Sequence, residues 1–318
     1  MNSYEKIHQL KADIEKKLTP LINQTKCILV GAPYYHNIGD HLIWRGIRDF
    51  FDQHNLKCLH TFSCFHHPQV GSIDKDCIIF YIGGGNIGDL YLDFSKQLAN
   101  VVQLFPDNRI IVFPQTIYYD SKTNEKYYLN LFASHKDLHF CARDKTTLQI
   151  LSDYFQDSRV LLVPDMAYYI NLSWLSSFKK ATTKEVLIIN RTDNEVNTSY
   201  SVKEEEDVSD WPTYENKLMV VNINLYFIRI HFYHIPLRSA FDWCWNAFQI
   251  HYFNKRMIKY GVSFISNYQH IKTTRLHGAI LAMLINKKVT IWDNSYGKNK
   301  HFYETWLHDV DQISLETP

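Results

Sequence analysis

The sequence predicts an α/β protein made of two domains, each with a mostly parallel sheet connected by helices. Short apolar runs alternate with longer stretches of helical period between about residues 26 and 172, with glycine or proline at the ends of the runs. After residue 185 the order of strand, helix and strand starts again. This repetition is typical of parallel sheets whose strands are joined by helices. We therefore expect two Rossmann-like domains that face each other across a cleft.

The first half contains five apolar runs typical of buried strands. We expect them at residues 27–33, 77–85, 109–116, 139–144 and 159–167. Three stretches between them have the apolar spacing of helices, at about residues 40–54, 90–105 and 145–155. A polar stretch of helical period opens the chain. Because strands and helices alternate, the five strands are predicted to lie parallel in one sheet.

A polar stretch, SSFKKATTKE, separates the two halves. We place the boundary there, with an N-terminal domain over residues 1–178 and a C-terminal domain over residues 179–318. The second half begins with an apolar run at 186–190 and repeats strand, helix and strand over about 262–295. Its last helix is expected to pack back on the first domain. Ligands of open α/β sheets bind beyond the carboxyl ends of the strands, so substrates should lie between the domains.

The composition is that of a soluble globular protein, with 318 residues of which 46% are hydrophobic and 21% are charged. The formal net charge of +1 provides no field that would hold the protein on nucleic acid, which is therefore not expected as a partner. The six cysteines form no C-x-x-C pair, as expected for reduced, structural thiols.

The predicted location is the cytoplasm. The first 18 residues lack the pattern of a secretory signal peptide, and no apolar run reaches the ~18 residues that cross a bilayer. The stretch 226–260 mixes Arg, Lys and His with Phe, Tyr and Trp. Such a mixture suits either peripheral contact with the inner face of a membrane or a helical pair packed on the core, and both interpretations stay open.

Glycine-rich loops follow two of the predicted strands. The run Gly83–Gly88 satisfies G-x-G-x-x-G at a strand-to-helix turn, where the backbone amides of Gly84, Gly85 and Asn86 could hold an anion. A nicotinamide cofactor would also need an acidic residue at the end of the next strand, which instead ends in Pro-Gln, so this cofactor is not expected. The alternative is that the glycines only allow a tight turn against the sheet.

The loops after these two strands share a pattern of Asn, Gly and Asp. The repeated positions are Asn37, Gly39 and Asp40 in the first loop and Asn86, Gly88 and Asp89 in the second. A shared ligand with hydroxyl groups would explain the match, and Asp40 or Asp89 could then act as a base. Asp40 is equally well explained as the N-cap of the following helix.

The segment TTRLHG, which begins at Thr273, stands between a predicted strand and an apolar helix. Arg275 can bind a carboxylate or phosphate through two N–H groups, and His277 titrates in the range where proton transfer is useful. The alternative is a helix cap with a histidine that only completes its own hydrogen bonds. Arg143 and Arg191 also end strands, and several guanidinium groups facing one cleft predict a small, highly charged anion as the ligand.

Metal-binding side chains gather between Cys58 and His67, with His60, Cys64 and His66 between them. Along a strand, these residues would be too spread out to meet at one zinc ion. No metal site is therefore expected.

Taken together, these motifs resemble the polysaccharide pyruvyl transferase family. In chain order they are N-x-G-D, G-G-G-N-x-G-D, A-R-D, R-T-D-N-E, T-x-R-L-H-G and D-N-S-Y-G-K-N, and they run over residues 31–299. T-x-R-L-H-G before an apolar helix is the most specific of them. The last motif contributes Asn294, Ser295, Tyr296 and Lys298, residue types that bind sugars or phosphates but that alone indicate only a turn.

The resemblance implies a fold similar to that of the GT-B glycosyltransferases, phosphoenolpyruvate as the donor and a hexose diol of a polysaccharide precursor as the acceptor. The product would be a cyclic pyruvate ketal, formed with release of phosphate in capsule or exopolysaccharide biosynthesis. The first domain would bind the acceptor, which we expect to be a lipid-linked oligosaccharide, and the second would bind the donor. No cofactor is expected besides phosphoenolpyruvate as co-substrate.

The resemblance also implies roles for individual residues. Arg275 and His277 match the donor site of the family. Arginines would hold the carboxylate and the phosphate of phosphoenolpyruvate, and His277 would be the general acid that protonates its methylene carbon. Asp40 and Asp89 are the candidates for the base. The other predicted substrate-binding residues are Leu276, Arg143, Arg191, Thr273, Asn37, Gly84, Gly85, Asn86, Asn294, Ser295, Tyr296 and Lys298.

Two other functions fit parts of the pattern. A nucleotide-sugar glycosyltransferase would have a similar two-domain cleft with phosphate-binding loops. A glycan-binding or scaffold protein would suit the aromatic content of 15%, but it has no need of a proton donor. Residues 196–260 match no motif of the family, so the sequence does not predict which sugar is the acceptor.

Overall fold

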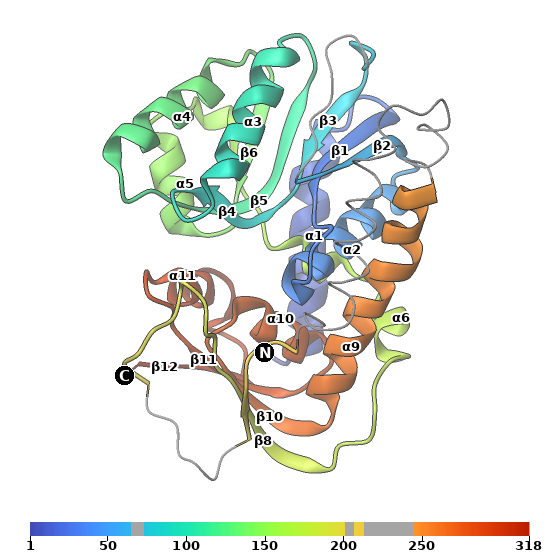
Figure 1. The fold of residues 1–318 in the computed structure, drawn as a ribbon, viewed down its shortest axis with the longest axis vertical. Helices are drawn as coiled ribbons and strands as arrows, with labels where there is room; N and C mark the ends of the chain where they lie inside the picture. Colours follow the sequence, from blue (N-terminus) through green and yellow to red (C-terminus); the bar gives the residue numbers. More distant parts are fainter. Residues whose placement is uncertain (65–72, 201–206, 213–243, 318) are drawn as a thin grey trace, which may run out of the picture.

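The computed structural model describes residues 1–64, 73–200, 207–212 and 244–317 (Figure 1). Within these residues the strands form two open sheets, and every strand pair in them is parallel. In the described residues, helices lie between β1 and β2, between β4 and β5, and between each later pair of successive strands except β8 and β9. The predicted α/β class with two Rossmann-like halves is thereby confirmed.

The first sheet has the strand order β2-β1-β3-β5-β6-β7 in the described residues, and β4 pairs with the second part of β5. From β1 the sheet grows in one direction to β2 and in the other to β3, and open α/β sheets bind ligands where the order reverses in this way. The strands are β1 (Lys26–Ala32), β2 (Lys57–Ser63), β3 (Ile78–Tyr81), β4 (Gly84–Gly88), β5 (Ile110–Tyr118), β6 (Leu138–Ala142) and β7 (Val160–Leu162).

The helices of the first half are α1 (Ser3–Leu18), α2 (Ile38–Gln53), α3 (Leu92–Leu104), α4 (Lys122–Ser134), α5 (Lys145–Ser152) and α6 (Leu172–Ser176). The sequence analysis missed β4 and α6, which are short, and two longer elements. The first is β2, which is an edge strand whose first four residues are exposed, so it lacks an apolar run. The second is α4, whose apolar side buries only Tyr128, Leu129 and Phe132.

The second sheet has the order β12-β11-β10-β8-β9 in the described residues. Its strands are β8 (Lys184–Ile189), β9 (Val208–Ser209), β10 (Tyr268–Thr273), β11 (Lys288–Trp292) and β12 (Ile313–Glu316). Its helices are α9 (Asn254–Ser266), α10 (Leu276–Leu284) and α11 (Lys298–Phe302), with π-helical segments at Phe248–Phe253 and Tyr303–Leu307. Helix α10 is apolar around most of its surface, and eight of its nine residues are buried, as expected for a helix between two layers.

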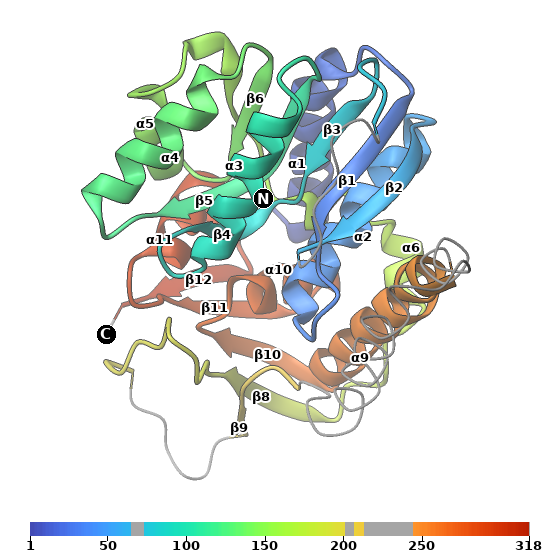
Figure 2. The same ribbon diagram turned by 45° about the horizontal axis from the view of Figure 1, so that its top comes forward.

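Helices α9 and α1 join the two halves. Figures 1 and 2 both show α9 running from the second sheet past α2 of the first half, and Gly261 of α9 packs against Ile38 of α2. Helix α1 contacts the end of the chain, where Lys6 Nζ lies 2.8 Å from Asp309 Oδ1. In the last helical segment, the indole of Trp306 donates a hydrogen bond to the Arg143 carbonyl at 2.7 Å. The division of the chain at residue 178 stays a prediction.

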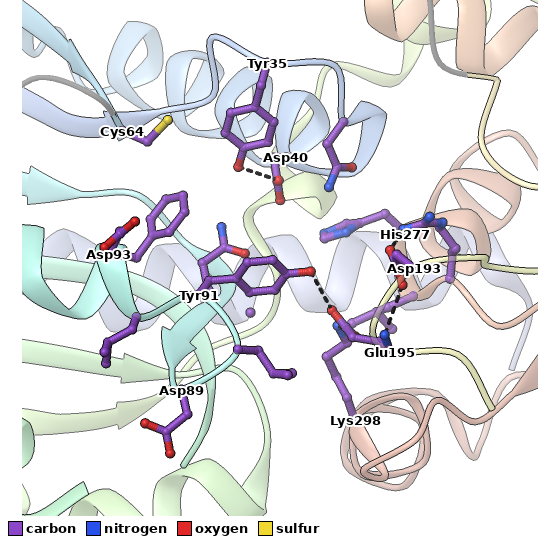
Figure 3. A pocket seen from close by; sticks show the side chains of 18 of the residues that line it. Tyr35, Asp40, Cys64, Asp89, Tyr91, Asp93, Asp193, Glu195, His277 and Lys298 are labelled. Atoms are coloured by element: carbon purple, nitrogen blue, oxygen red, sulfur yellow. Dashed lines mark hydrogen bonds and ion pairs between the residues drawn. The ribbon is translucent and has the colours of Figure 1, made fainter. Parts of the chain in front are cut away.

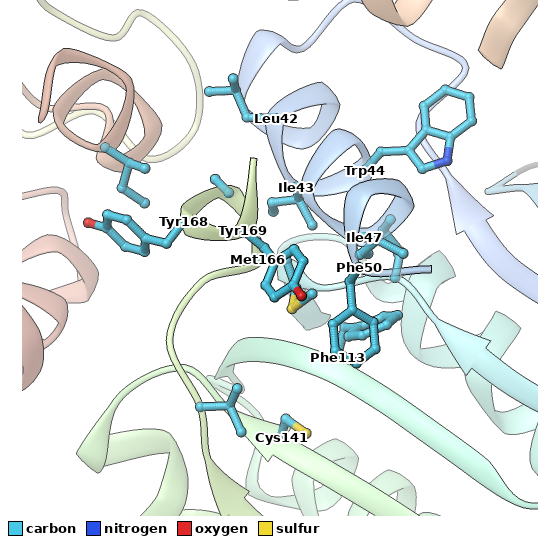
Figure 4. Packing of buried hydrophobic residues seen from close by; sticks show 14 of the residues in the cluster. Leu42, Ile43, Trp44, Ile47, Phe50, Phe113, Cys141, Met166, Tyr168 and Tyr169 are labelled. Carbon is cyan, nitrogen blue, oxygen red and sulfur yellow. The ribbon is translucent and has the colours of Figure 1, made fainter. Parts of the chain in front are cut away.

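A close contact of α2 with the turn Met166–Tyr169 helps to position the site. Figure 4 shows the apolar face of α2, including Ile43 and Phe50, packed around Met166 and Tyr169. A Cβ atom at Gly46 of α2 would lie 1.8 Å from the Met166 carbonyl oxygen, so this approach requires glycine. The turn that follows β7 is therefore held firmly against α2.

The stretch 226–260 is described only from residue 244. Its described part forms the π-helical segment and the start of α9, with Phe253, Met257 and Ile258 buried in the core. The burial of these side chains agrees with the alternative in which this stretch packs on the core. Residues 226–243 lie outside the described residues. Nowhere in the described chain is there a helix that combines the length and the apolar character needed to cross a membrane.

Candidate active site

A cavity of about 890 Å3 lies between the two halves, at the carboxyl ends of the strands of both sheets (Figure 3). The first half contributes the loops after β1, β4 and β6, and the second half contributes those after β8, β9, β10 and β11. The sequence-predicted residues that line it are Asn37, Asp40, Gly85, Asn86, Asp89, Arg143, Arg191, Arg275, Leu276, His277 and Lys298.

Five predicted residues, Gly84, Thr273, Asn294, Ser295 and Tyr296, are not part of the lining. Gly84 lies directly before the lining residues of its loop. Thr273 Oγ1 accepts a hydrogen bond from the Arg275 amide at 2.9 Å, so it positions that arginine. The Asn294 amide group and the Tyr296 hydroxyl bind Glu195, and the Ser295 amide donates to the Glu195 carbonyl. These contacts place the 294–296 segment behind the cavity wall.

His277, at the start of α10, reaches across to the first half. Its Nε2 lies 3.2 Å from Asp165 Oδ2, and the same oxygen accepts a hydrogen bond from Arg143 Nη1 at 2.8 Å. Asp165 and Arg143 are each only 1% exposed at the side chain. Burial alone would raise the pKa of Asp165, but the charges of His277 and Arg143 hold this pKa below its usual value. The sequence analysis missed Asp165 as a site residue, although it lies in the run 159–167 that was predicted as a strand.

Asp40 projects from the first turn of α2 into the cavity and is 6% exposed. The Tyr35 hydroxyl donates a hydrogen bond to its Oδ2 at 2.7 Å, as Figure 3 shows. The N-cap of α2 is Asn37, whose side-chain oxygen accepts a hydrogen bond from the Gly39 amide, so the N-cap alternative for Asp40 is wrong. Burial raises the pKa of Asp40 above its usual value, although the charge of His277 and the Tyr35 hydrogen bond counteract part of this shift.

Asp89 has a different environment. Its Oδ2 accepts a hydrogen bond from the Ser121 amide at 2.7 Å, and its Oδ1 accepts one from Asn124 Nδ2 at 2.6 Å. Both partners belong to the start of α4. The carboxylate of Asp89 is therefore engaged in fixing this helix to the end of β4.

Glu195 forms the centre of a buried polar cluster that the sequence analysis did not assign to the site. Its Oε2 accepts hydrogen bonds from Lys298, from Arg191 Nη1 at 2.6 Å and from Asn294 Nδ2 at 3.0 Å. The Tyr91 hydroxyl of the first half lies 3.5 Å from its Oε1 (Figure 3). Burial would raise the pKa of Glu195, but the charges of Lys298 and Arg191 lower it to about 2. Burial also lowers the pKa of Lys298 to about 8, an effect that Glu195 only partly offsets.

The arginines of the cavity are each paired with carboxylates. Arg275 donates two hydrogen bonds to Asp210, and both Arg275 and Arg191 lie within about 3 Å of Asp193. The lining contains five Lys or Arg side chains and five Asp or Glu side chains. An anionic ligand would therefore share these guanidinium groups with carboxylates. The expected cluster of cations is present, but it is balanced by acidic residues that the sequence pattern did not predict.

Metal-binding side chains do not gather in the described part of the chain. No group of three or more His, Cys, Asp or Glu residues there could hold a metal ion. Of the side chains considered for zinc, His66 and His67 lie outside the described residues. Cys64 lines the cavity near Tyr35, while Cys58 lies on the edge strand β2.

Two parallel sheets whose carboxyl ends face one charged cavity define a Rossmann-like protein with a ligand-binding site between its halves. The chain belongs to the polysaccharide pyruvyl transferase family, whose model matches residues 37–296. It is therefore a transferase of the pyruvyl transferase group. The matched range contains the residues of the site from Asn37 to Tyr296, and Tyr35 and Lys298 each lie two residues outside it.

Individual relatives agree with this assignment. The chain is 29% identical to EpsO of Bacillus subtilis (strain 168), which is provisionally named a pyruvyl transferase, over 99% of this chain and 96% of that protein. It is 26% identical to pyruvyl transferase 1 of Schizosaccharomyces pombe, over 91% of this chain and 72% of that protein. The fold is similar to the crystal structure of KP1_0663 from Klebsiella pneumoniae, with a TM-score of 0.67 and 22% identity over 97% of this chain and 99% of that chain.

Proposed function

We propose that the protein transfers a pyruvyl group from phosphoenolpyruvate to a hexose diol of a polysaccharide precursor, forming a cyclic ketal and releasing phosphate. The observation that supports this most directly is the convergence of His277, Arg275 and Arg143 on one wall of a cavity that has Asp40 nearby. This set supplies a proton donor, anion-binding groups and a base in one place. Capsule or exopolysaccharide biosynthesis is the proposed setting.

The donor would bind near the cationic residues. Phosphoenolpyruvate carries a carboxylate and a phosphate, and guanidinium groups bind both in a bidentate manner. Arg275 and Arg191 come from the second half and Arg143 from the first, so the donor would lie across the seam. Lys298, whose pKa burial lowers to about 8, is partly protonated at neutral to weakly alkaline pH and would neutralise charge on the departing phosphate.

The proposed reaction has three steps. His277 gives a proton to the methylene carbon, so that positive charge develops on the adjacent carbon beside the carboxylate. One sugar hydroxyl attacks this carbon and loses its proton to Asp40, and the C–O bond to phosphate breaks. The second hydroxyl then attacks the same carbon and closes the ketal, its proton returns to His277, and Asp40 gives its proton to the departing phosphate. Asp40 is the better candidate for the base than Asp89, because both oxygens of Asp89 already hold the start of α4.

The acceptor is proposed to be a lipid-linked oligosaccharide, and the support for this comes from the sequence. Residues 226–260 combine aromatic and basic side chains, which suits contact with a membrane surface. The core position of Phe253 and Met257 limits any such contact to the earlier part of the stretch or to exposed side chains such as Tyr252.

The test is release of phosphate from phosphoenolpyruvate by the purified protein, with a panel of galactosyl, glucosyl and N-acetylmannosaminyl acceptors and mass spectrometry of the products. A product that has gained a pyruvate ketal supports the proposal. Release of a nucleoside diphosphate from a nucleotide sugar, without use of phosphoenolpyruvate, would instead establish a glycosyltransferase.

Arg275→Ala is expected to raise the KM for phosphoenolpyruvate about 10²-fold, because a bidentate charge-assisted interaction is lost. Steady-state kinetics with varied phosphoenolpyruvate measures this change. Arg256→Ala, on the exposed side of α9, is the matched control and should leave KM unchanged. An unchanged KM in Arg275→Ala would remove this arginine from the donor site.

Asp40→Asn is expected to lower kcat about 10²-fold and to remove the acidic limb of the pH–rate profile. A base works in its deprotonated form, so activity is lost as the pH falls through its pKa. Because burial raises the pKa of Asp40, this limb should lie above the range of an ordinary carboxyl group. Asp89→Asn should lower thermal stability and keep the acidic limb of the pH–rate profile. Loss of this limb in Asp89→Asn and its retention in Asp40→Asn would make Asp89 the base.

A further inference from the structure

The ion triad of Asp165, His277 and Arg143 spans the seam between the two halves. Asp165 belongs to the turn after β7 and Arg143 to the end of β6, whereas His277 belongs to α10 of the second half. The turn that carries Asp165 is fixed by its tight packing on α2, and the Ala167 amide donates a hydrogen bond to Asp165 Oδ1 at 2.9 Å. Asp165 is thus a rigid partner for the imidazole.

The hydrogen bond to Asp165 assigns the tautomer of His277. Asp165 is ionised, because its neighbours hold its pKa low, so it accepts a hydrogen bond from the N–H group at Nε2. In the neutral ring Nδ1 then carries a lone pair, and in the protonated ring Nδ1 carries the exchangeable proton. Among the described residues Nδ1 has no hydrogen-bond partner.

Gly39 lies directly against this free nitrogen. A Cβ atom at position 39 would be 2.5 Å from Nδ1 and 2.7 Å from Cγ of His277. Gly39 is in the first turn of α2 and has an ordinary helical backbone, so the conformation itself does not require glycine there. The close contact with the imidazole is therefore the physical reason for glycine in the N-x-G-D motif.

We propose that Asp165 is a positioning residue that fixes His277 so that Nδ1 is the atom which transfers the proton, and that the absence of a side chain at Gly39 allows the ring to take this position. The identity of the reaction rests on the proposed function, but the orientation of the ring does not. A buried carboxylate that binds one nitrogen of an imidazole both sets its tautomer and stabilises its protonated form.

The charges around His277 determine the pH effect. Asp165 and Asp40 are the carboxylates that face it, and Arg143 and Lys298 are the cations that lie near the same pair. Removal of the Asp165 charge leaves the imidazolium with less stabilisation. A general acid works in its protonated form, so the alkaline limb of the pH–rate profile should move to lower pH in Asp165→Asn.

The chain contains a matched control for this triad at a distant edge of the first sheet. Asp137 accepts hydrogen bonds from His139 Nε2 at 3.1 Å and from Arg109 Nε at 3.0 Å. It has the same three residue types and the same pattern of partners, but it does not line the cavity. Asp137→Asn should change the local histidine and leave catalysis unchanged.

The experiment combines NMR of the protein with 15N-labelled histidine and pH–rate profiles. The signals of His277 are identified by their loss in His277→Gln. In the wild type they should show the tautomer protonated at Nε2, which requires no substrate. In Asp165→Asn we expect a changed tautomer ratio, kcat lower by about 10²-fold, and an alkaline limb at lower pH, with the KM for phosphoenolpyruvate within a few-fold of wild type.

Gly39→Ala provides a second variant that keeps the carboxylate and the helical backbone. Its methyl group would lie 2.5–2.8 Å from three atoms of His277, so the ring must shift away from its position beside Asp165, and we expect kcat to fall by about 10²-fold although the carboxylate is still present. A wild-type signal protonated at Nδ1, or full turnover in Gly39→Ala, would overturn the proposal. Absence of any turnover with phosphoenolpyruvate in the wild type, with the Nε2 tautomer present, would contradict the proposed function and leave the positioning role intact.

Discussion

Replacing His277 with alanine is expected to lower kcat by about 10³-fold while the affinity for phosphoenolpyruvate changes by no more than a few-fold. The imidazole supplies a proton in the proposed reaction, whereas Arg275, Arg191 and Lys298 hold the charges of the donor. Loss of the ring therefore removes an interaction that matters in the transition state and preserves the groups that bind the ground state. Steady-state kinetics and calorimetry with phosphoenolpyruvate measure the two quantities separately.

The matched control for this variant is His139→Ala. His139 is also bonded through Nε2 to an aspartate that binds an arginine, but it lies far from the cavity. It should show wild-type kcat and KM. Normal turnover in His277→Ala would exclude His277 as the general acid, and loss of donor binding in the same variant would make it a binding residue instead.

Glu195→Ala is expected to reduce the free energy of unfolding by about 3–5 kcal/mol at neutral pH. Glu195 is 3% exposed, and its removal leaves the buried ammonium group of Lys298 without a carboxylate partner and leaves Arg191 with Asp193 alone. Urea unfolding followed by circular dichroism measures the change. Glu304→Ala, which removes a carboxylate from an exposed pair with Lys300, should lie within about 0.5 kcal/mol of wild type.

The pH dependence of this difference has a definite sign. The pKa of Glu195 is lowered in the folded protein from an ordinary value of 4.5 to about 2. Its contribution to stability is thus fully present above pH 4.5 and is lost as the pH falls towards 2. The difference between wild type and Glu195→Ala should narrow over this interval. A difference that stays constant would show that Glu195 acts through packing rather than through its charge.

The fold could be predicted from local patterns where strands are buried on both faces. The runs that became β1, β3, β5 and β6 are almost continuously apolar, as parallel strands between two layers of helices must be. The edge strand β2 has no such run. Helix α4 was missed because its buried side is narrow, and its position depends on Asp89, which is distant in the sequence.

The candidate site was predictable where a residue type is rare at its position. Arg275 and His277 stand out because a charged and a titratable residue precede a very apolar helix. Asp165, Glu195 and Tyr35 do not stand out, since each resembles an ordinary polar residue of a turn. Their importance comes from partners more than 100 residues away for Asp165 and Glu195, and sequence spacing alone contains no information on such contacts.

The position of α1 bears on the construction of hybrid enzymes from this family. Helix α1 comes first in the chain, yet the Met1 ammonium and Lys6 bind Asp309, and Ser3 binds Gln312, close to β12. A chimaera that exchanges the halves of two relatives at residue 178 would transplant α1 without the surface that receives it. Recombination that exchanges the second half between relatives should therefore take α1 and the segment 309–312 from the same parent.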